Sequence, residues 1–110
     1  MNIESLRDYC LSLPEVTESF PFDQTTLVFK VKDKMFLLTD LEDLFSICVK
    51  CDPDLALDLR EHFACVKPGY HMNKQHWNTI VIDGTVGDQQ LIEWINHSYN
   101  LVAKRKKKQD

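Results

Sequence analysis

The hydrophobic positions of the first 50 residues follow a helical period and then a strand period. Before Pro14, apolar residues recur at helical spacing and predict an amphipathic helix with the stripe Ile3, Leu6, Cys10 and Leu13. After a connector that contains Pro21, strand-forming residues alternate with polar ones. This alternation predicts a hairpin that turns at Lys32 and Asp33 and then a third strand, over residues 26–31, 35–39 and 44–50.

The second half of the chain has two further helical stripes around one more strand pattern. Asp52 before Pro53 is typical of a helix start, because the carboxylate caps the first turn and proline suits its first position. This helix should end near Ala64, and its apolar stripe is Leu55, Ala56, Leu59 and Phe63. A strand over residues 77–82 follows, and Asp88 is the predicted cap of a last helix with the stripe Leu91, Ile92, Ile95, Tyr99 and Val102.

The order of these elements is helix, three strands, helix, strand, helix. Consecutive strands joined by tight turns imply an antiparallel sheet, and amphipathic helices must bury their stripes against one of its faces. The predicted class is therefore α+β, with the helices packed on one face of the sheet.

Length and composition are those of a single globular domain. At 110 residues, 12.9 kDa and 44% hydrophobic residues, the chain can bury a core without metals or disulfides. We expect one domain over residues 1–103 and a basic, disordered tail over residues 104–110. No apolar run approaches the roughly 18 residues of a membrane span, and no signal peptide pattern is present at the start. These features predict a cytoplasmic protein without a membrane partner, with reduced thiols at Cys10, Cys48, Cys51 and Cys65.

The net charge of −4 conceals an uneven distribution. Five of the 13 basic groups are in the tail and one of the 17 acidic groups is Asp110, so residues 1–103 carry 8 basic and 16 acidic groups. An acidic body is unfavourable for a nucleic-acid binder, whose affinity comes largely from neutralised phosphates. The tail could attract an anionic polymer, although terminal lysine runs are more often solvated extensions.

The segment from Pro68 to Gly84, PGYHMNKQHWNTIVIDG, has the highest density of candidate functional side chains. Polar residues interleaved with Tyr70 and Trp77 are typical of a recognition surface. They equally suit an anchored turn, in which the aromatic rings pack and the amides cap backbone groups. Composition favours the anchored turn, and both interpretations stay open at the level of sequence.

Two other patterns could carry chemistry. Cys48 and Cys51 have the spacing of a metal or redox pair, with His62, Cys65, His71 and His76 downstream, but a strand over 44–50 directs the two thiols to opposite faces. His71, His76 and Asp83 could form an acid/base set, yet no nucleophile elbow or glycine-rich phosphate loop accompanies them. We therefore expect no catalytic residues, no metal site and no cofactor.

The motifs of the chain resemble those of the MmcQ/YjbR-like family. Four of the matching pieces are Pro14 to Glu18, Phe20-Pro21-Phe22, Val31 with Lys34-Met35-Phe36, and Lys50-Cys51-Asp52-Pro53. The most specific are Pro68 to Lys74 with His76 to Thr79, and Ser98-Tyr99 with Leu101-Val102. The resemblance spans nearly all of residues 1–102. It implies a frataxin-like (CyaY-like) fold and a double-wing motif for DNA binding. Family hairpins usually turn through Gly, where this chain has Lys32-Asp33.

These observations predict a noncatalytic, monomeric DNA-binding protein that uses two projecting β-turns as wings. The hairpin edge Lys30, Lys32 and Lys34 forms one wing and the turn over residues 67–78 the other. The predicted nucleic-acid contacts are Lys34, Lys67, Tyr70, His71, Asn73, Lys74, His76 and Asn78. The alternative is a module for an unidentified small molecule or protein, with a pocket lined by residues 70–78 beside Trp77. A frataxin-like metal role for Glu4 and Asp8 is a third candidate.

Overall fold

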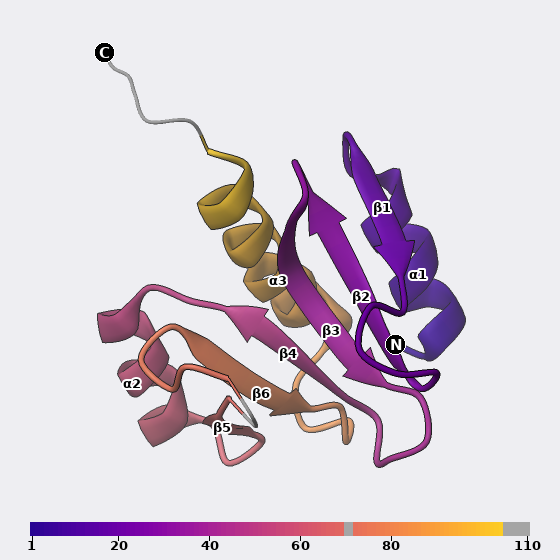
Figure 1. The fold of residues 1–110 in the computed structure, drawn as a ribbon. Coiled ribbons are helices and arrows are strands. Elements are labelled where there is room, and N and C mark those ends of the chain that lie inside the picture. Colours follow the sequence, from indigo (N-terminus) through magenta and orange to yellow (C-terminus); the bar gives the residue numbers. More distant parts are fainter. Residues whose placement is uncertain (70–71, 105–110) are drawn as a thin grey trace.

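The computed structural model describes residues 1–69 and 72–104 as three helices and one six-stranded antiparallel sheet (Figure 1). The strand order is β1-β2-β3-β4-β6-β5. The helices are α1 (Ile3–Ser12), α2 (Pro53–His62) and α3 (Asp88–Ala103). The strands are β1 (Val16–Ser19), β2 (Thr26–Val31), β3 (Lys34–Asp40), β4 (Ser46–Lys50), β5 (Val66–Pro68) and β6 (Trp77–Val81). The predicted α+β class is confirmed.

Two strands were missed by the sequence pattern, and both lie at an edge of the sheet. β1 has four residues, three of them polar, and it starts after Glu15, whose φ of 64° lets the chain reverse at the end of α1. β5 has three residues and includes Pro68, which cannot donate a ladder hydrogen bond. Neither strand contains the alternating apolar run by which an interior strand is recognised.

All three helices pack on the same face of the sheet. In Figure 1 the sheet lies in front of α1 and α3, so the face toward the viewer carries no helix. The helices contribute Leu6, Cys10, Ala56, Leu59, Leu91, Trp94 and Ile95 to the core. The sheet contributes Leu27, Phe29, Val31, Phe36, Leu37, Ile47, Val49, Val66 and Ile80. Burying one such side chain stabilises the fold by about 1.5–3 kcal/mol, so this interface holds the layers together.

The starts of the helices follow simple capping chemistry. The Asn2 side chain accepts a hydrogen bond from the Ser5 amide at 2.8 Å, and the Ser5 hydroxyl completes a capping box at α1. Asp52 caps α2 and Pro53 follows it, as predicted. The predicted cap of α3 was wrong by one residue: Gly87 is the cap, and Asp88 lies in the first turn, where it accepts a hydrogen bond from the amino group of Met1 at 2.9 Å.

β3 and β4 form the weakest ladder of the sheet. Both strands are fully described, yet their register pairs only Leu37 with Val49 and Leu38 with Cys48. A bulge at this point of β3 turns both Phe36 and Leu37 toward the core. The sheet therefore has two halves, β1-β2-β3 and β4-β6-β5, and Figure 1 shows them diverging toward the β2–β3 turn.

No helix among the described residues has the length and apolar content needed to cross a membrane.

Candidate nucleic-acid interface

The two predicted wings extend from the same end of the sheet. The turn of Lys32 and Asp33 joins β2 to β3 at this end of the sheet. β4 runs antiparallel to β3, so its last residue, Lys50, lies at the same end. Lys50 pairs with Trp77, the first residue of β6, so the β5–β6 turn lies at that end too. The strand order leaves β4 alone between the two turns.

The first wing is a two-residue turn made without glycine. Lys32 and Asp33 have φ values of 54° and 66°, the positive pair that type I′ hairpin turns require. The Lys32 ammonium donates a hydrogen bond of 3.1 Å to the carbonyl of Ala103, at the C-terminal end of α3. Lys34 is exposed and pairs across the ladder with Val31, a core residue, so it lies toward the helical side of the sheet. Lys32 and Asp33 thus form the tight turn without the conformational freedom of glycine.

The second wing is fastened to the molecule by Arg60 of α2. The Arg60 Nε donates to Asn78 Oδ1 at 2.7 Å, and its Nη2 donates to the carbonyls of Lys74 and Trp77. The Asn78 amide donates in turn to the carbonyl of Ala56 at 3.3 Å. Asn78 is 1% exposed, so its predicted contact with nucleic acid is wrong. Its side chain is committed to joining α2 to β6.

Several backbone contacts hold the same turn from within. Asn73 Oδ1 accepts from the amide of Gln75 at 2.8 Å, and the Lys74 ammonium donates to the carbonyl of Gly69 at 3.1 Å. A Cβ atom on Gly69 would lie 2.7 Å from the Cβ of Trp77, too close for any side chain. The structure therefore favours the anchored turn over a freely projecting recognition loop. Tyr70 and His71, two predicted contacts, lie outside the described residues.

The predicted contacts do not form a single cluster. Lys34 is on β3, whereas Lys67 is on β5 at the far edge of the sheet. Asn73 and Lys74 are exposed on the second wing, His76 is half-buried there, and Trp77 beside them is buried.

A row of lysines crosses the helix-free face of the sheet. Side-chain alternation directs Lys30, Lys50 and Lys67 to this face, because Phe29, Val49 and Val66 beside them enter the core on the other side. The three lysines lie on β2, β4 and β5, which are every second strand of the sheet. Lys67 lies two residues farther from the wings than Lys50, because it pairs with Thr79 and Lys50 pairs with Trp77. Among the described residues, neither Lys30 nor Lys50 shows a side-chain hydrogen bond or an ion pair. We call this row the lysine face.

The lysine face is only partly predictable from the sequence. Lys30 and Lys67 were assigned to separate wings and Lys50 to no site. Their common face follows from the sheet order, which brings β4 and β5 within two strands of each other.

Most acidic residues lie elsewhere on the molecule, but Asp83 is near Lys67. Hydrogen bonds from Thr85, and to a smaller extent the charge of Lys67, lower the pKa of the Asp83 carboxyl. Of the strand residues, all of which are described, Asp40 is the only carboxylate directed to the helix-free face, and it lies at the end away from the wings. The helices carry two arginines, Arg7 and Arg60, against the carboxylates Glu4, Asp8, Asp54, Asp58, Glu61, Asp88 and Glu93. The helix-free face of the sheet is therefore less acidic than the chain as a whole.

The thiols have the character of core residues. Burial raises the pKa of Cys10 to about 12, and burial together with the carboxylate of Asp52 raises the pKa of Cys51 to about 11. Cys51 belongs to the core cluster while Cys48 lies on the opposite face, as the strand pattern predicts. Within residues 1–69 and 72–104, no three His, Cys, Asp or Glu side chains are arranged to hold a metal ion.

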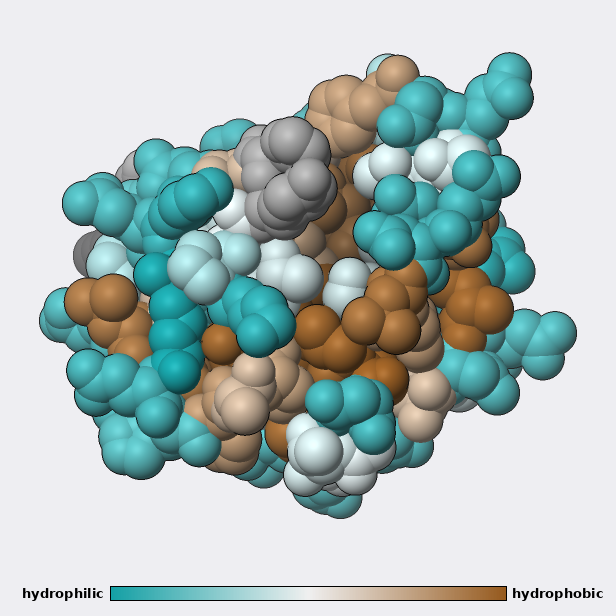
Figure 2. Space-filling view, turned by 90° about the horizontal axis from the view of Figure 1, so that it is seen from below, coloured by the Kyte–Doolittle hydropathy of each residue, from teal (hydrophilic) through white to brown (hydrophobic). Residues whose placement is uncertain are grey.

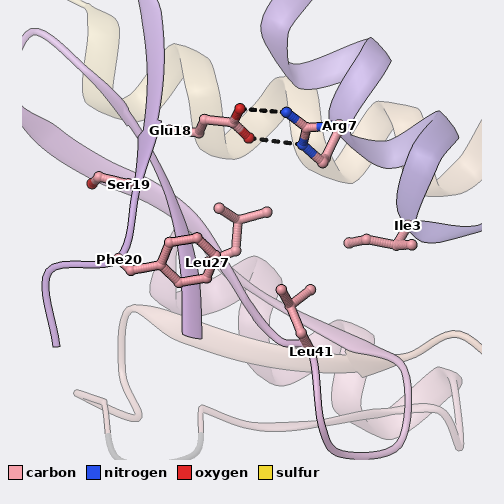
Figure 3. A pocket seen from close by; sticks show the side chains of 7 residues that line it. All are labelled: Ile3, Arg7, Glu18, Ser19, Phe20, Leu27 and Leu41. Carbon is pink, nitrogen blue, oxygen red and sulfur yellow. Dashed lines mark hydrogen bonds and ion pairs between the residues drawn. The ribbon is translucent and has the colours of Figure 1, made fainter. Parts of the chain in front are cut away.

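Among the described residues, three hollows lie away from residues 72–78, the described part of the predicted pocket segment. In the described part of that segment, Asn78 lines a hollow of about 10 Å³, room for roughly one water molecule. Hollows of about 390, 440 and 520 Å³ are lined by other residues, and Figure 3 shows the first of these.

Comparisons with known proteins cover almost the whole chain. The family model described as YjbR matches residues 11–101. The uncharacterized protein YjbR of Escherichia coli K12 is 33% identical over 113 residues, which cover 98% of this chain and 96% of the relative. The uncharacterized protein YbdF of Escherichia coli O157:H7 is 35% identical over 108 residues, covering 97% and 88%.

Two crystal structures have the same fold. Deinococcus radiodurans protein DR2400, described as a DUF419 domain, is 42% identical with a TM-score of 0.89, over 98% of this chain and 83% of that one. A Pseudomonas syringae protein is 26% identical with a TM-score of 0.80, over 93% and 99%.

Proposed function

The chain belongs to the YjbR family, and from that premise we propose that it is a noncatalytic DNA-binding protein whose lysine face meets the phosphate backbone. The observation that carries the proposal is the row of Lys30, Lys50 and Lys67 on every second strand of a face that no helix covers. Lysines on an uncovered face of the sheet suit a polyanion, because each lysine can neutralise one phosphate and release its counterions.

The contacts are to phosphates rather than to bases. Lysine is a flexible point charge without the planar fork that reads a base edge. Trp77, which pairs with Lys50 in the sheet, is buried, and so its indole is not offered for stacking. Lys74 on the second wing can add a further phosphate contact, and Asn73 and His76 can hydrogen-bond the sugar–phosphate backbone. The binding is therefore weakly selective for sequence.

The charge of the lysine face sets the expected salt dependence. Three neutralised phosphates on duplex DNA give a slope of log K against log salt of about −2.7. Between 50 and 200 mM salt the affinity then falls about 40-fold. A protein that binds through more lysines, such as those of the tail, shows a steeper slope.

The noncatalytic part of the proposal is supported by the thiols. Cys10 and Cys51 have pKa values raised to about 12 and about 11, so neither supplies a thiolate nucleophile near neutral pH.

The test is fluorescence anisotropy of a labelled random duplex at 50 and 200 mM salt, with the full chain. The basic tail is first neutralised by replacing Lys104, Arg105, Lys106, Lys107 and Lys108 with Gln. The measured binding then comes from the folded domain alone. Two triple variants of the tail-neutral chain then each remove three positive charges, one variant from the lysine face and the other from the wings. The face variant is K30Q/K50Q/K67Q and the wing variant is K32Q/K34Q/K74Q.

We expect the tail-neutral chain to bind with a slope near −2.7, and the face variant to bind at least tenfold more weakly with a slope near zero. The wing variant should lose less than about threefold. Loss of all binding on neutralising the tail would contradict the proposal, because the fold itself would then not bind DNA. A larger loss in the wing variant would move the contacts from the lysine face to the turns.

A further inference from the structure

The end of the molecule opposite the wings exposes large apolar side chains. Phe20, Leu41 and Leu44 are 47%, 45% and 67% exposed, and they lie in the β1–β2 and β3–β4 connections. Figure 2 views the molecule from below Figure 1, the side on which the β3–β4 connection lies, and shows hydrophobic surface near the centre with hydrophilic residues around it. Large apolar side chains grouped at one end of a small domain indicate an interaction site.

Two hollows adjoin each other there, and both are lined by Ile3 and Leu41. The first, of about 390 Å³, is completed by Phe20, Leu27, Ser19 and the ion-paired Arg7 and Glu18. Figure 3 shows Phe20, Leu27 and Leu41 close together below that ion pair. The second hollow, of about 520 Å³, is completed by Met1, Asn2, Thr39, Asp40, Asp43 and Phe45. Each is large enough to take one bulky side chain.

The rim of the two hollows is acidic. Asp40, at the end of β3, and Glu42 and Asp43, in the β3–β4 connection, are all exposed, and Asp40 and Asp43 line the second hollow. Across the end of the sheet, Asp23 accepts hydrogen bonds from Thr25 and Thr26, which lower the pKa of its carboxyl and keep it ionised. The two connections, residues 20–25 and 41–45, are fully described and contain no lysine or arginine. Arg7, the nearby cation, is engaged by Glu18.

We propose that this end is a docking site for a basic amphipathic segment of another protein. Two bulky apolar side chains of that segment enter the hollows on either side of Leu41, and its lysines or arginines meet Asp40, Glu42 and Asp43. Charge complementarity selects this occupant, since an acidic rim repels nucleic acid and anionic lipid alike. The chain's own tail, KRKKK, has the charge but no bulky apolar residue for the hollows. Two apolar anchors with basic flanks are the features of a helix bound in a groove.

The test uses a displayed library of random 12-residue peptides, selected on the full chain and counter-selected on the variant L41S/D43N. Both replaced side chains are exposed, so the variant keeps its fold, which circular dichroism checks. The most enriched peptides are then synthesised and titrated by fluorescence anisotropy. The matched control is L57S/D58N on α2, because Leu57 is 58% exposed beside a carboxylate but lines neither hollow.

We expect the enriched peptides to carry two bulky apolar residues and a net positive charge. Their Kd should rise at least tenfold for L41S/D43N and less than threefold for L57S/D58N. The proposal is overturned if no peptide survives the counter-selection, if the survivors are neutral or acidic, or if the control variant weakens binding as much as L41S/D43N. None of these outcomes depends on DNA binding, which uses the opposite end and the lysine face.

Discussion

At the scale of single residues, the Ser98 hydroxyl joins β3 to β4 just beyond the last residue pair of the ladder between the two strands. It donates a hydrogen bond to the carbonyl of Phe36 and accepts one of 2.8 Å from the amide of Lys50. These groups belong to β3 and β4, at the point where the two strands part. Ser98 itself is fully buried, so water cannot replace the hydroxyl. One side chain of α3 thus closes the weakest ladder of the sheet.

Ser98→Ala should lower the free energy of unfolding by about 2–4 kcal/mol, because it leaves two buried backbone groups without partners. Urea denaturation measures the change. Ser12→Ala is the control, since the Ser12 hydroxyl bonds the Tyr9 carbonyl in an exposed position, and its loss should be below about 1 kcal/mol. Equal losses of unfolding free energy in the two variants would show that the Ser98 hydrogen bonds between β3 and β4 stabilise the fold no more than an exposed hydrogen bond does.

Gly69→Ala should destabilise the protein by about 1–3 kcal/mol, because the new Cβ would lie 2.7 Å from the Cβ of Trp77 and displace the second wing. Gly87→Ala is the paired control. Gly87 has a φ of −73° and open space around it, so that change should alter stability by less than about 1 kcal/mol. Thermal melting gives the melting temperatures of both variants. A Gly69→Ala protein as stable as the parent chain would contradict the prediction, because the second wing would then accommodate a Cβ atom at residue 69 without cost.

At the scale of elements, α1 is tied to the edge strand β1 by Arg7 and Glu18. Both atoms of the Glu18 carboxylate accept hydrogen bonds from the guanidinium. The hydrogen bond and charge of Arg7 lower the pKa of Glu18 in the folded protein. The pair therefore contributes stability above the ordinary glutamate pKa of about 4.3, and this contribution is lost as the pH falls through the lower folded value.

Glu18→Gln should consequently lower the melting temperature at pH 7 by a few degrees, as a surface pair is worth at most about 1 kcal/mol. The difference from the parent chain should shrink between pH 5 and pH 3 and vanish when the carboxylate is protonated. Circular dichroism melts across this range give the comparison. Glu15→Gln, at an exposed carboxylate outside any ion pair of the described residues, should show no such convergence.

The elements also show which parts of the fold the sequence could predict. Interior strands and helices were predictable, because a strand such as β2 directs alternate residues, Leu27, Phe29 and Val31, into the core cluster and α3 carries a continuous apolar stripe. The edge strands β1 and β5 were not, since an edge pairs on one side and needs no apolar run. Asn78 resembles a surface residue until Arg60, eighteen positions earlier, is found beside it. Lys50 joined the candidate site only through strand order, which no local pattern contains.

At the scale of the whole molecule, the sheet halves β1-β2-β3 and β4-β6-β5 meet through two pairs of residues in the β3–β4 ladder, and α3 lies across both halves. Leu91, Trp94 and Ile95 of α3 belong to a core cluster that also includes Phe29 of one half and Ile80 of the other. A helix shared in this way couples the halves, because neither can open without exposing its side of the helix. The molecule should therefore unfold as one cooperative unit.

Cysteine labelling tests this coupling, because Cys10 packs in the α1 half and Cys65 in the other half, and both are buried. Two variants each keep one thiol: C48A/C51A/C65A and C10A/C48A/C51A. Each thiol is labelled under native conditions over a range of urea concentrations. The free energy of opening that labelling reports should lie within about 0.5 kcal/mol of the free energy of global unfolding of the same variant. Cys10 is fully buried, so its labelling requires opening. If Cys65 instead reacted at a much lower free energy and with a smaller urea slope, the β4-β6-β5 half would open alone, and α3 would belong to the other half only.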